Sequence, residues 1–119
     1  LITMNAGPIE HFDKWDIRRD AEPTLRQVTE IIQRYPRAKV AIAGHTDAKG
    51  ADAYNLQLSA RRATSVKAWL VQYGGVEGKR MTTKGRGEAK PVAPNTHPDG
   101  SDNPEGRQKN RRVELTVQK

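Results

Sequence analysis

The chain contains no cysteine, which excludes disulfide bonds, thiol catalysis and cysteine-ligated zinc and leaves the redox compartment open. It also lacks long hydrophobic runs, and none approaches the roughly 18 apolar residues of a membrane span. Residues 1–8 do not have the charged, apolar and small-residue segments of a signal peptide. Because the sequence begins at Leu1 rather than Met, we expect a fragment of a larger protein whose anchor or export signal lies elsewhere.

Aromatic residues are scarce, at 5%, whereas 29% of the residues are charged and 34% are hydrophobic. A length of 119 residues suits one compact domain, and we expect residues 1–119 to form it. The 21 basic residues against 14 acidic ones give a net charge of +7. That charge indicates polyanionic surroundings, such as nucleic acid, anionic lipid or an anionic wall polymer, without choosing among them.

Two segments have the periodicity of amphipathic helices. The first begins after a capping residue, Asp20, tolerates Pro23 in its first turn and ends at Pro36. Its apolar stripe is Leu25, Val28, Ile32 and Tyr35. The second helix carries the stripe Ser59, Ala63, Val66, Leu70 and Tyr73 and stops at the Gly74-Gly75 pair. Each helix therefore needs a surface to cover.

That surface is predicted to be a β-sheet. Residues 39–44 form a small apolar strand, and residues 112–118 alternate with Val113, Leu115 and Val117 on one face. Weaker strands are predicted at 9–12 and 80–84. The order strand, helix, strand, helix, strand, strand predicts an α/β (α+β) sandwich, in which a mixed sheet of about four strands carries two long helices on one face. Residues 87–106, rich in Pro, Gly, Asn and Asp, are expected to be a structureless loop that is functional or mobile.

Polar residues gather after the strand at 39–44, where α/β sheets place ligands. Asp47 follows this strand and Arg62 lies near the start of the second helix, so the chain reversal brings a carboxylate and a guanidinium toward one pocket. Such a pair suits a zwitterion, because Asp47 can bind an ammonium while Arg62 donates two parallel hydrogen bonds to a carboxylate. Two structural alternatives stay open: the two side chains pair with each other, or Asp47 caps the helix while Arg62 is solvated.

Three ordered motifs then identify a resemblance. They are Gly44-His45-Thr46-Asp47 followed by Gly50, Asn55, Leu58-Ser59 and Arg62-Ala63; Gly85-Arg86-Gly87-Glu88; and Gly106-Arg107 with Asn110-Arg111-Arg112-Val113-Glu114. With this spacing the sequence, from Phe12-Asp13 to Leu115, closely resembles the OmpA C-terminal-like domain of OmpA, Pal and MotB proteins. Residues 14–16 depart from the family's small and polar stretch, and the segment 95–105 is longer than in many members.

The resemblance implies that the chain is a periplasmic domain of a Gram-negative envelope protein. It also implies that this domain binds peptidoglycan non-covalently, is not an enzyme and uses no cofactor. The ligand implied is the diaminopimelate of the stem peptide, whose free end is a zwitterion. In the family, the residues matching Asp47 and Arg62 contact that end. Asn55, Arg111 and a rim contact from Asp13 are carried over in the same way, with Thr46 and the backbone amides near Leu58 completing the pocket. Membrane attachment would come only through segments outside this sequence.

Other interpretations were weighed against this one. A catalytic His45 lacks a nucleophile and an orienting partner, and three scattered histidines do not have zinc-ligand spacing. Residues 99–103 superficially resemble a calcium loop, but the ligand alternation is wrong and turn formation explains them. Nucleic-acid binding is motivated by the charge, yet no basic stretch is interleaved with stacking aromatics, so we expect none. A protein-interaction or dimerisation module of an envelope or flagellar-stator complex is the alternative function, with Trp15 and Trp69 on its surface and a homodimer as one outcome.

Overall fold

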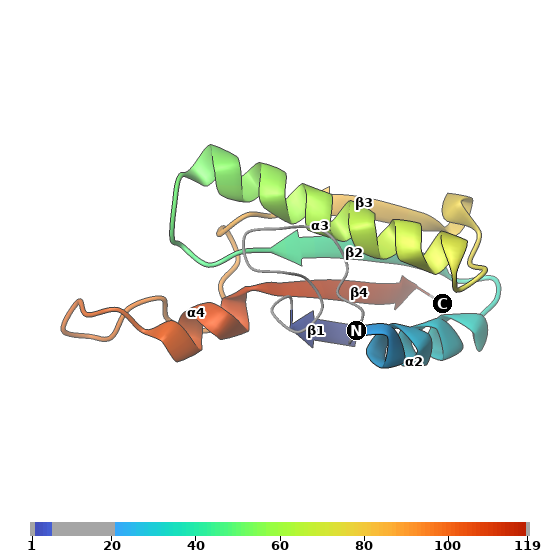
Figure 1. Cartoon of the computed structure of the whole chain (residues 1–119), viewed down its shortest axis with the longest axis horizontal. Coiled ribbons are helices and arrows are strands. Elements are labelled where there is room, and N and C mark those ends of the chain that lie inside the picture. The colour runs from blue at the N-terminus through green and yellow to red at the C-terminus, as the bar shows by residue number, and fades with distance from the viewer. Residues whose placement is uncertain (1, 6–20, 119) are drawn as a thin grey trace.

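The computed structural model describes residues 2–5 and 21–118 of the chain. The elements in this part are, in chain order, β1 (Ile2–Asn5), α2 (Glu22–Gln33), β2 (Lys39–His45), α3 (Asp52–Gln72), the short 3-10 helix η2 (Gly78–Arg80), β3 (Met81–Gly85), α4 (Pro104–Asn110) and β4 (Arg112–Gln118). Figure 1 shows the long helix α3 lying along β2 and β3, and the short helix α4 at the opposite end of the molecule from α2.

The strands form one mixed sheet in the order β1-β4-β2-β3. β4 is antiparallel to both of its neighbours, with Leu115 opposite Ile2 on one side and opposite Ile42 on the other. β2 and β3 run parallel, and α3 makes the crossover between them. Parallel strands need such a crossover, whereas antiparallel neighbours do not. The predicted fold class, a mixed four-stranded sheet with two long helices, is confirmed.

One hydrophobic core lies between the helices and a single face of the sheet. The positions facing it in the sheet are Val40, Ile42, Met81, Val113 and Leu115, and the helices contribute Leu25, Val28, Ile32, Ala63, Val66 and Leu70. The predicted apolar stripes of both helices thus fall largely in this core. Trp69 is only half-buried and packs against the core edge, with its ring 5.5 Å from that of Tyr73, whereas Trp15 lies outside the described residues.

Several predicted boundaries differ from the structure. The N-cap of α2 is Ala21, which makes no side-chain capping bond, and not the predicted Asp20, which lies outside the described residues. The strand predicted at 9–12 also lies outside them and is not tested; an unpredicted strand, β1 at Ile2–Asn5, pairs with β4 on the side away from β2. Tyr35 is not part of the first helix, because α2 ends at Gln33 and Tyr35 is an exposed turn residue. The predicted structureless loop is also too long: α4 begins at Pro104, where Asn103 accepts a hydrogen bond from the Gly106 N–H as its N-cap.

Among the described residues, no helix combines the length and the apolar character needed to cross a bilayer.

The approach of α3 to the sheet depends on glycine. A Cβ at Gly44 on β2 would lie 2.1 Å from the carbonyl oxygen of Ser59, and a Cβ at Gly85 on β3 would lie 2.5 Å from the backbone nitrogen of Ala60. No side chain fits in that space, so the helix backbone rests directly on both strands. The hydroxyl of Ser59 also accepts a hydrogen bond from the Gly87 N–H at 2.9 Å, which ties the end of β3 to the same turn of the helix.

We expect Gly44→Ala to destabilise the fold, because the obstructing atom is backbone and the whole helix would have to move. Overpacking of this kind costs about 1–3 kcal/mol or more. Chemical denaturation measures the change. Gly78→Ala is the matched control, since its nearest neighbour would be the Val71 side chain at an ordinary 3.7 Å. Equal stability of the two variants would contradict the close approach.

Candidate functional site

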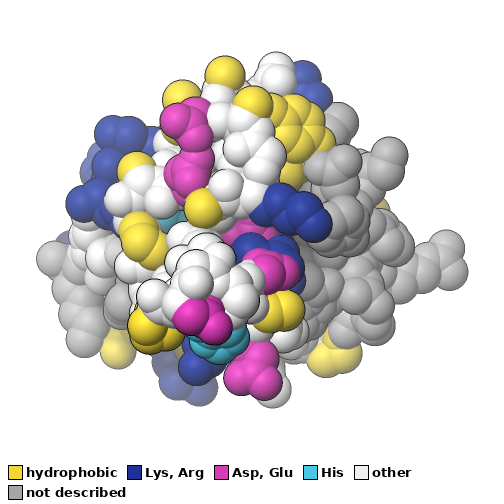
Figure 2. Space-filling view, turned by 90° about the vertical axis from the view of Figure 1, so that its left-hand side faces the viewer, with side chains coloured by type: hydrophobic (Ala, Val, Ile, Leu, Met, Phe, Trp, Pro, Cys, Tyr) yellow, Lys and Arg dark blue, Asp and Glu magenta, His cyan; other side chains and the backbone are white. Residues whose placement is uncertain are grey.

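A small cavity opens where the parallel strands β2 and β3 end and β4 begins. Its volume is about 230 Å³, and the residues lining it are Thr46, Asp47, Lys49, Gly50, Tyr54, Asn55, Leu58, Arg62 and Arg111. Figure 2 looks onto this end of the molecule and shows acidic and basic side chains side by side near the middle of the surface. We refer to this cavity as the main pocket.

The carboxylate of Asp47 is the acidic group of the main pocket, and the residue is only 6% exposed. One oxygen, Oδ1, accepts a hydrogen bond from the Lys49 N–H at 2.9 Å. The other, Oδ2, accepts one from the Arg111 guanidinium at 2.6 Å and lies 3.5 Å from Nη1 of Arg107. Charge-assisted bonds of this type fix a carboxylate in one orientation. The ion-pair partners of Asp47 among the described residues are therefore Arg111 and Arg107, not Arg62.

The loop that carries Asp47 is fixed by the side chain of Asn55 on α3. Its amide nitrogen donates to the carbonyl oxygens of Lys49, at 3.0 Å, and Asp47, at 3.4 Å. Thr46 closes the other side of this loop, with its N–H donating to the carbonyl of Gly87 at 2.8 Å. Both side chains are buried, so these bonds satisfy groups that water does not reach. Thr46 and Asn55 thus shape the pocket.

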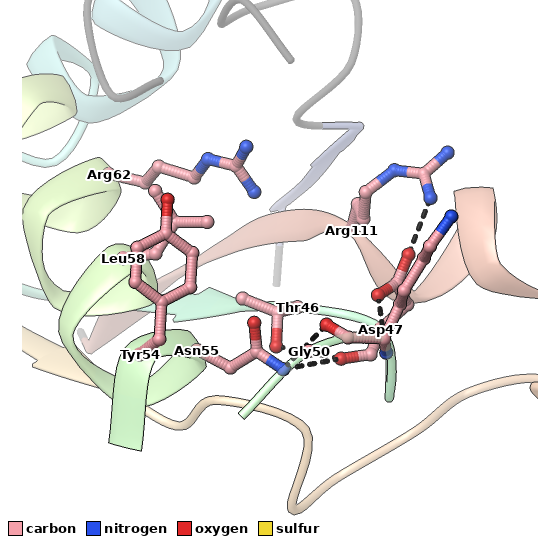
Figure 3. A pocket seen from close by; sticks show the side chains of 9 residues that line it. Thr46, Asp47, Gly50, Tyr54, Asn55, Leu58, Arg62 and Arg111 are labelled. Carbon is pink, nitrogen blue, oxygen red and sulfur yellow. Dashed lines mark hydrogen bonds and ion pairs between the residues drawn. The ribbon is translucent and has the colours of Figure 1, made fainter. Parts of the chain in front are cut away.

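The opposite wall of the main pocket belongs to α3. Tyr54, Leu58 and Arg62 are spaced four residues apart and so share one face of the helix. Figure 3 shows the guanidinium of Arg62 extending from this wall toward the side where Arg111 and Asp47 lie. Arg62 is 3% exposed as a residue. Because α3 begins at Asp52, Leu58 is well inside the helix, where backbone N–H groups bond within the helix. Leu58 therefore lines the pocket with its side chain.

Arg111 is placed by the buried Asn110 that precedes it. The Asn110 amide accepts hydrogen bonds from the Val92 and Ala93 N–H groups and donates to the Ala93 carbonyl and to Oδ1 of Asn95. This single side chain anchors the segment before α4 against the end of that helix. The next residue, Arg111, then reaches the main pocket from the side of the sheet.

The structure brings together six of the residues predicted from sequence, which are Thr46, Asp47, Asn55, Leu58, Arg62 and Arg111. The seventh, Asp13, lies outside the described residues. Sequence reasoning missed Lys49, Tyr54 and the ion pair between Arg107 and Asp47. The helical spacing of Tyr54 and Leu58 was a usable signal for Tyr54. Arg107 is 60 positions away from Asp47 in the sequence, so no local sequence pattern indicated their contact.

His45 lies next to the site in sequence but faces a different environment. The residue is 2% exposed, and neither ring nitrogen has a hydrogen-bond partner among the described residues. Nε2 lies 3.3 Å from Oε1 of Glu114, whose other oxygen accepts from Nε of Arg112 at 2.8 Å. His45 does not line the main pocket, and no cluster of three or more metal-ligating side chains occurs in residues 2–5 and 21–118.

Burial, followed by the charge of Arg112, lowers the pKa of His45 below its ordinary value of 6.5, although Glu114 opposes the shift. His45 therefore binds a proton more readily in the unfolded chain than in the folded chain. The free energy of unfolding should fall as the pH decreases through 6.5. In His45→Gln this loss should be smaller. Urea midpoints between pH 5 and 8 measure it, with His97→Gln in an exposed loop as the control. The same pH dependence in His45→Gln and the wild type would refute the assignment.

Comparison with known proteins places this geometry in a family. The sequence model of the OmpA family matches residues 11–111. A protein named photosystem I P700 chlorophyll a apoprotein A2 from Gloeobacter violaceus is 54% identical over 98% of the chain, which spans 13% of that protein. A peptidoglycan-associated lipoprotein from Rhizobium meliloti is 42% identical over 77% of the chain, with 53% of its own length covered.

Among solved structures, the cell wall anchor of the T6SS from Pseudomonas aeruginosa superimposes with a TM-score of 0.83 and 30% identity. That match covers 98% of this chain and 78% of the other. The chain thus spans only a part of each of these relatives. The family model covers most of the chain, including every residue of the main pocket. The chain therefore belongs to the OmpA family.

Proposed function

We propose that this chain binds peptidoglycan non-covalently through the diaminopimelate of the stem peptide and so tethers an envelope protein to the cell wall. The observation that carries the proposal is the placement of one carboxylate and two guanidinium groups around a single small pocket. Asp47 comes from the loop after β2, Arg62 from α3 and Arg111 from the C-cap position between α4 and β4. These charges suit an amino-acid head group, which carries an ammonium and a carboxylate on one carbon.

The ammonium of the ligand is assigned to Asp47. Its carboxylate has about four acceptor positions, and among the described residues two hydrogen bonds to it are made, from the Lys49 N–H and from Arg111, with Arg107 a further 3.5 Å ion-pair contact. An ammonium in the main pocket can therefore take a remaining position without displacing either donor. Because the residue is 6% exposed, the interaction would be screened less than a surface ion pair.

The carboxylate of the ligand is assigned to Arg62. A guanidinium presents parallel N–H groups that match the two oxygens of a carboxylate, and α3 holds the residue in a rigid helix. Figure 3 shows that Arg62 and Asp47 lie on opposite sides of the pocket, so a ligand between them meets both charges at once. Asn55 and Thr46 fix the loop that sets their separation.

The relatives support the same function. The Rhizobium protein is named as peptidoglycan-associated, and the Pseudomonas structure is described as a cell wall anchor. The position of His45 supports a role in binding, because its buried nitrogens do not line the main pocket and so are not placed to exchange a proton with a ligand there. We propose a periplasmic location for this domain, with residues 1–119 acting as one unit.

The net charge is compatible with nucleic-acid binding, but the positions of the arginines do not support it. In each basic cluster at least one arginine is used internally: Arg80 donates to the carbonyls of Ala38 and Tyr35, at 3.0 and 2.7 Å, and Arg112 donates to those of Asn110 and Lys90. Arg62 is buried. These residues are not presented to a phosphate backbone as a continuous stripe, which a nucleic-acid-binding surface requires.

We expect Asp47→Asn to abolish most binding to insoluble diaminopimelate-type sacculi, because it removes the charge while keeping an acceptor for the Lys49 N–H. Arg62→Lys should act similarly, since a lysine keeps the charge but loses the forked geometry. A loss of more than about tenfold is expected for each, as hydrogen bonds to charged groups contribute about 1.5–3 kcal/mol. Sedimentation with the sacculi, with meso-diaminopimelate as competitor, measures it.

Asp99→Asn in an exposed turn and Arg61→Lys, the exposed neighbour of Arg62, are the matched controls and should bind as the wild type does. The assay is run at two salt concentrations. If binding were unchanged in Asp47→Asn and Arg62→Lys but abolished by salt, the +7 charge would simply be adhering to an anionic polymer, and the proposed site would be wrong.

A further inference from the structure

A second cavity adjoins the main pocket, and none of the ligand contacts proposed above lies in it. Its volume is about 270 Å³, and its lining residues are Ala48, Lys49, Asn95, Thr96, Asp102 and Arg107. Lys49 lines both cavities, and Arg107 lies on the second while its Nη1 is 3.5 Å from Asp47 of the first. One wall comes from the long segment between β3 and α4. We refer to this cavity as the side pocket.

Asn95 lies on the lining of the side pocket, and its amide has a hydrogen-bond donor that no described residue uses. Its Oδ1 accepts from the Ala48 N–H at 3.2 Å and from the amide nitrogen of Asn110 at 2.9 Å. These two donors fix which end of the amide is oxygen, because both require an acceptor. Nδ2 of Asn95 then makes no hydrogen bond among the described residues, and the side chain as a whole is held in place.

The acidic residue of the side pocket is already neutralised. Asp102 accepts two parallel hydrogen bonds from Arg107, from Nε to Oδ1 and from Nη2 to Oδ2, each 2.7 Å long. The hydrogen bond from Arg107 holds the pKa of Asp102 below its ordinary value. Lys49, in contrast, is exposed and has no carboxylate within ion-pair distance among the described residues. The group left to attract a ligand is thus cationic.

The charges of the main pocket lead to the same chemistry. Among the described residues of its lining, Arg111 is paired with Asp47, and Lys49 makes no ion pair. A zwitterionic head group between Asp47 and Arg62 leaves the ammonium of Lys49 without a carboxylate. A ligand that carries one more carboxylate, within reach of Lys49, complements it.

We propose that the side pocket is a subsite for a carboxylate of the stem peptide, on the acidic residue adjacent to diaminopimelate. Lys49 supplies the positive charge, and Nδ2 of Asn95 donates a hydrogen bond to the carboxylate. The ion pair with Asp102 holds the Arg107 side chain in the lining of the side pocket. This proposal rests on the proposed function, because it requires diaminopimelate in the main pocket. The long segment 95–105 then serves to extend the recognised surface from one amino acid to a peptide.

The test compares three soluble ligands by calorimetry: meso-diaminopimelate, the stem tripeptide that ends in it, and the same tripeptide with its glutamate carboxylate amidated. Two variants are used. Lys49→Gln removes the charge, and Asn95→Asp keeps the acceptor for Ala48 and Asn110 while replacing the free donor with a negative oxygen. Lys84→Gln on β3, away from both pockets, is the matched control.

The wild type should bind the tripeptide about three- to tenfold more tightly than either the free amino acid or the amidated peptide. Both variants should lose this preference. Asn95→Asp should keep its affinity for meso-diaminopimelate within about twofold, whereas Lys49→Gln also alters the lining of the main pocket, so its readout is the ratio of the tripeptide affinity to the affinity for the free amino acid. Equal binding of all three ligands by the wild type, or equal loss for all three in the variants, would overturn the subsite and leave the main pocket intact. Failure of the wild type to bind any of them would overturn the proposed function as well.

Discussion

The ion pair between Asp47 and Arg111 is the interaction around which this end of the molecule is organised. It joins the loop after β2 to the C-cap of α4, just before β4, over 64 positions of sequence, with a contact of 2.6 Å. Arg107 approaches the same carboxylate from α4, and Asn55 of α3 donates to the backbone carbonyls of Asp47 and Lys49. Four parts of the chain thus converge on one acidic group. A buried carboxylate of this kind is stable only because its partners are present, which makes the site and the local fold interdependent.

The main pocket owes its shape to the packing of α3. Because Gly44 and Gly85 have no side chain, the helix lies directly on β2 and β3. The first turns of the helix then lie beside the loop that carries Asp47. Tyr54, Leu58 and Arg62 then face that loop across a narrow gap (Figure 3). The arrangement places charged groups on rigid elements, which suits recognition of a small ligand by preformed geometry. The mixed sheet contributes by bringing the ends of two parallel strands and the start of an antiparallel one to the same edge.

Local patterns predicted most of the fold and the main members of the site. The stripe from Leu25 to Ile32 and the alternation of Val113 and Leu115 are short-range signals, and the structure places these residues in one core. Thr46 and Asp47 were found from their position at a strand end, and Arg111 from the family resemblance. Helix α4 was missed because Pro104, Glu105 and Gly106 do not have an apolar period, and its cap, Asn103, lies in a stretch that also favours turns. The role of Arg107 was not predictable from local sequence, because its partners are set by how Asn110 anchors the preceding segment.

The central claim is that a zwitterion binds between Asp47 and Arg62, and nuclear magnetic resonance tests it most directly. In a titration of ¹⁵N-labelled protein with meso-diaminopimelate, the account predicts saturable shifts at the Nε–H of Arg62 and Arg111, the amide of Asn55 and the backbone N–H of Lys49. Residues 34–38, at the opposite end of β2, should not respond. Shifts absent from the main pocket, or spread over exposed lysines and arginines and removed by salt, would contradict the account.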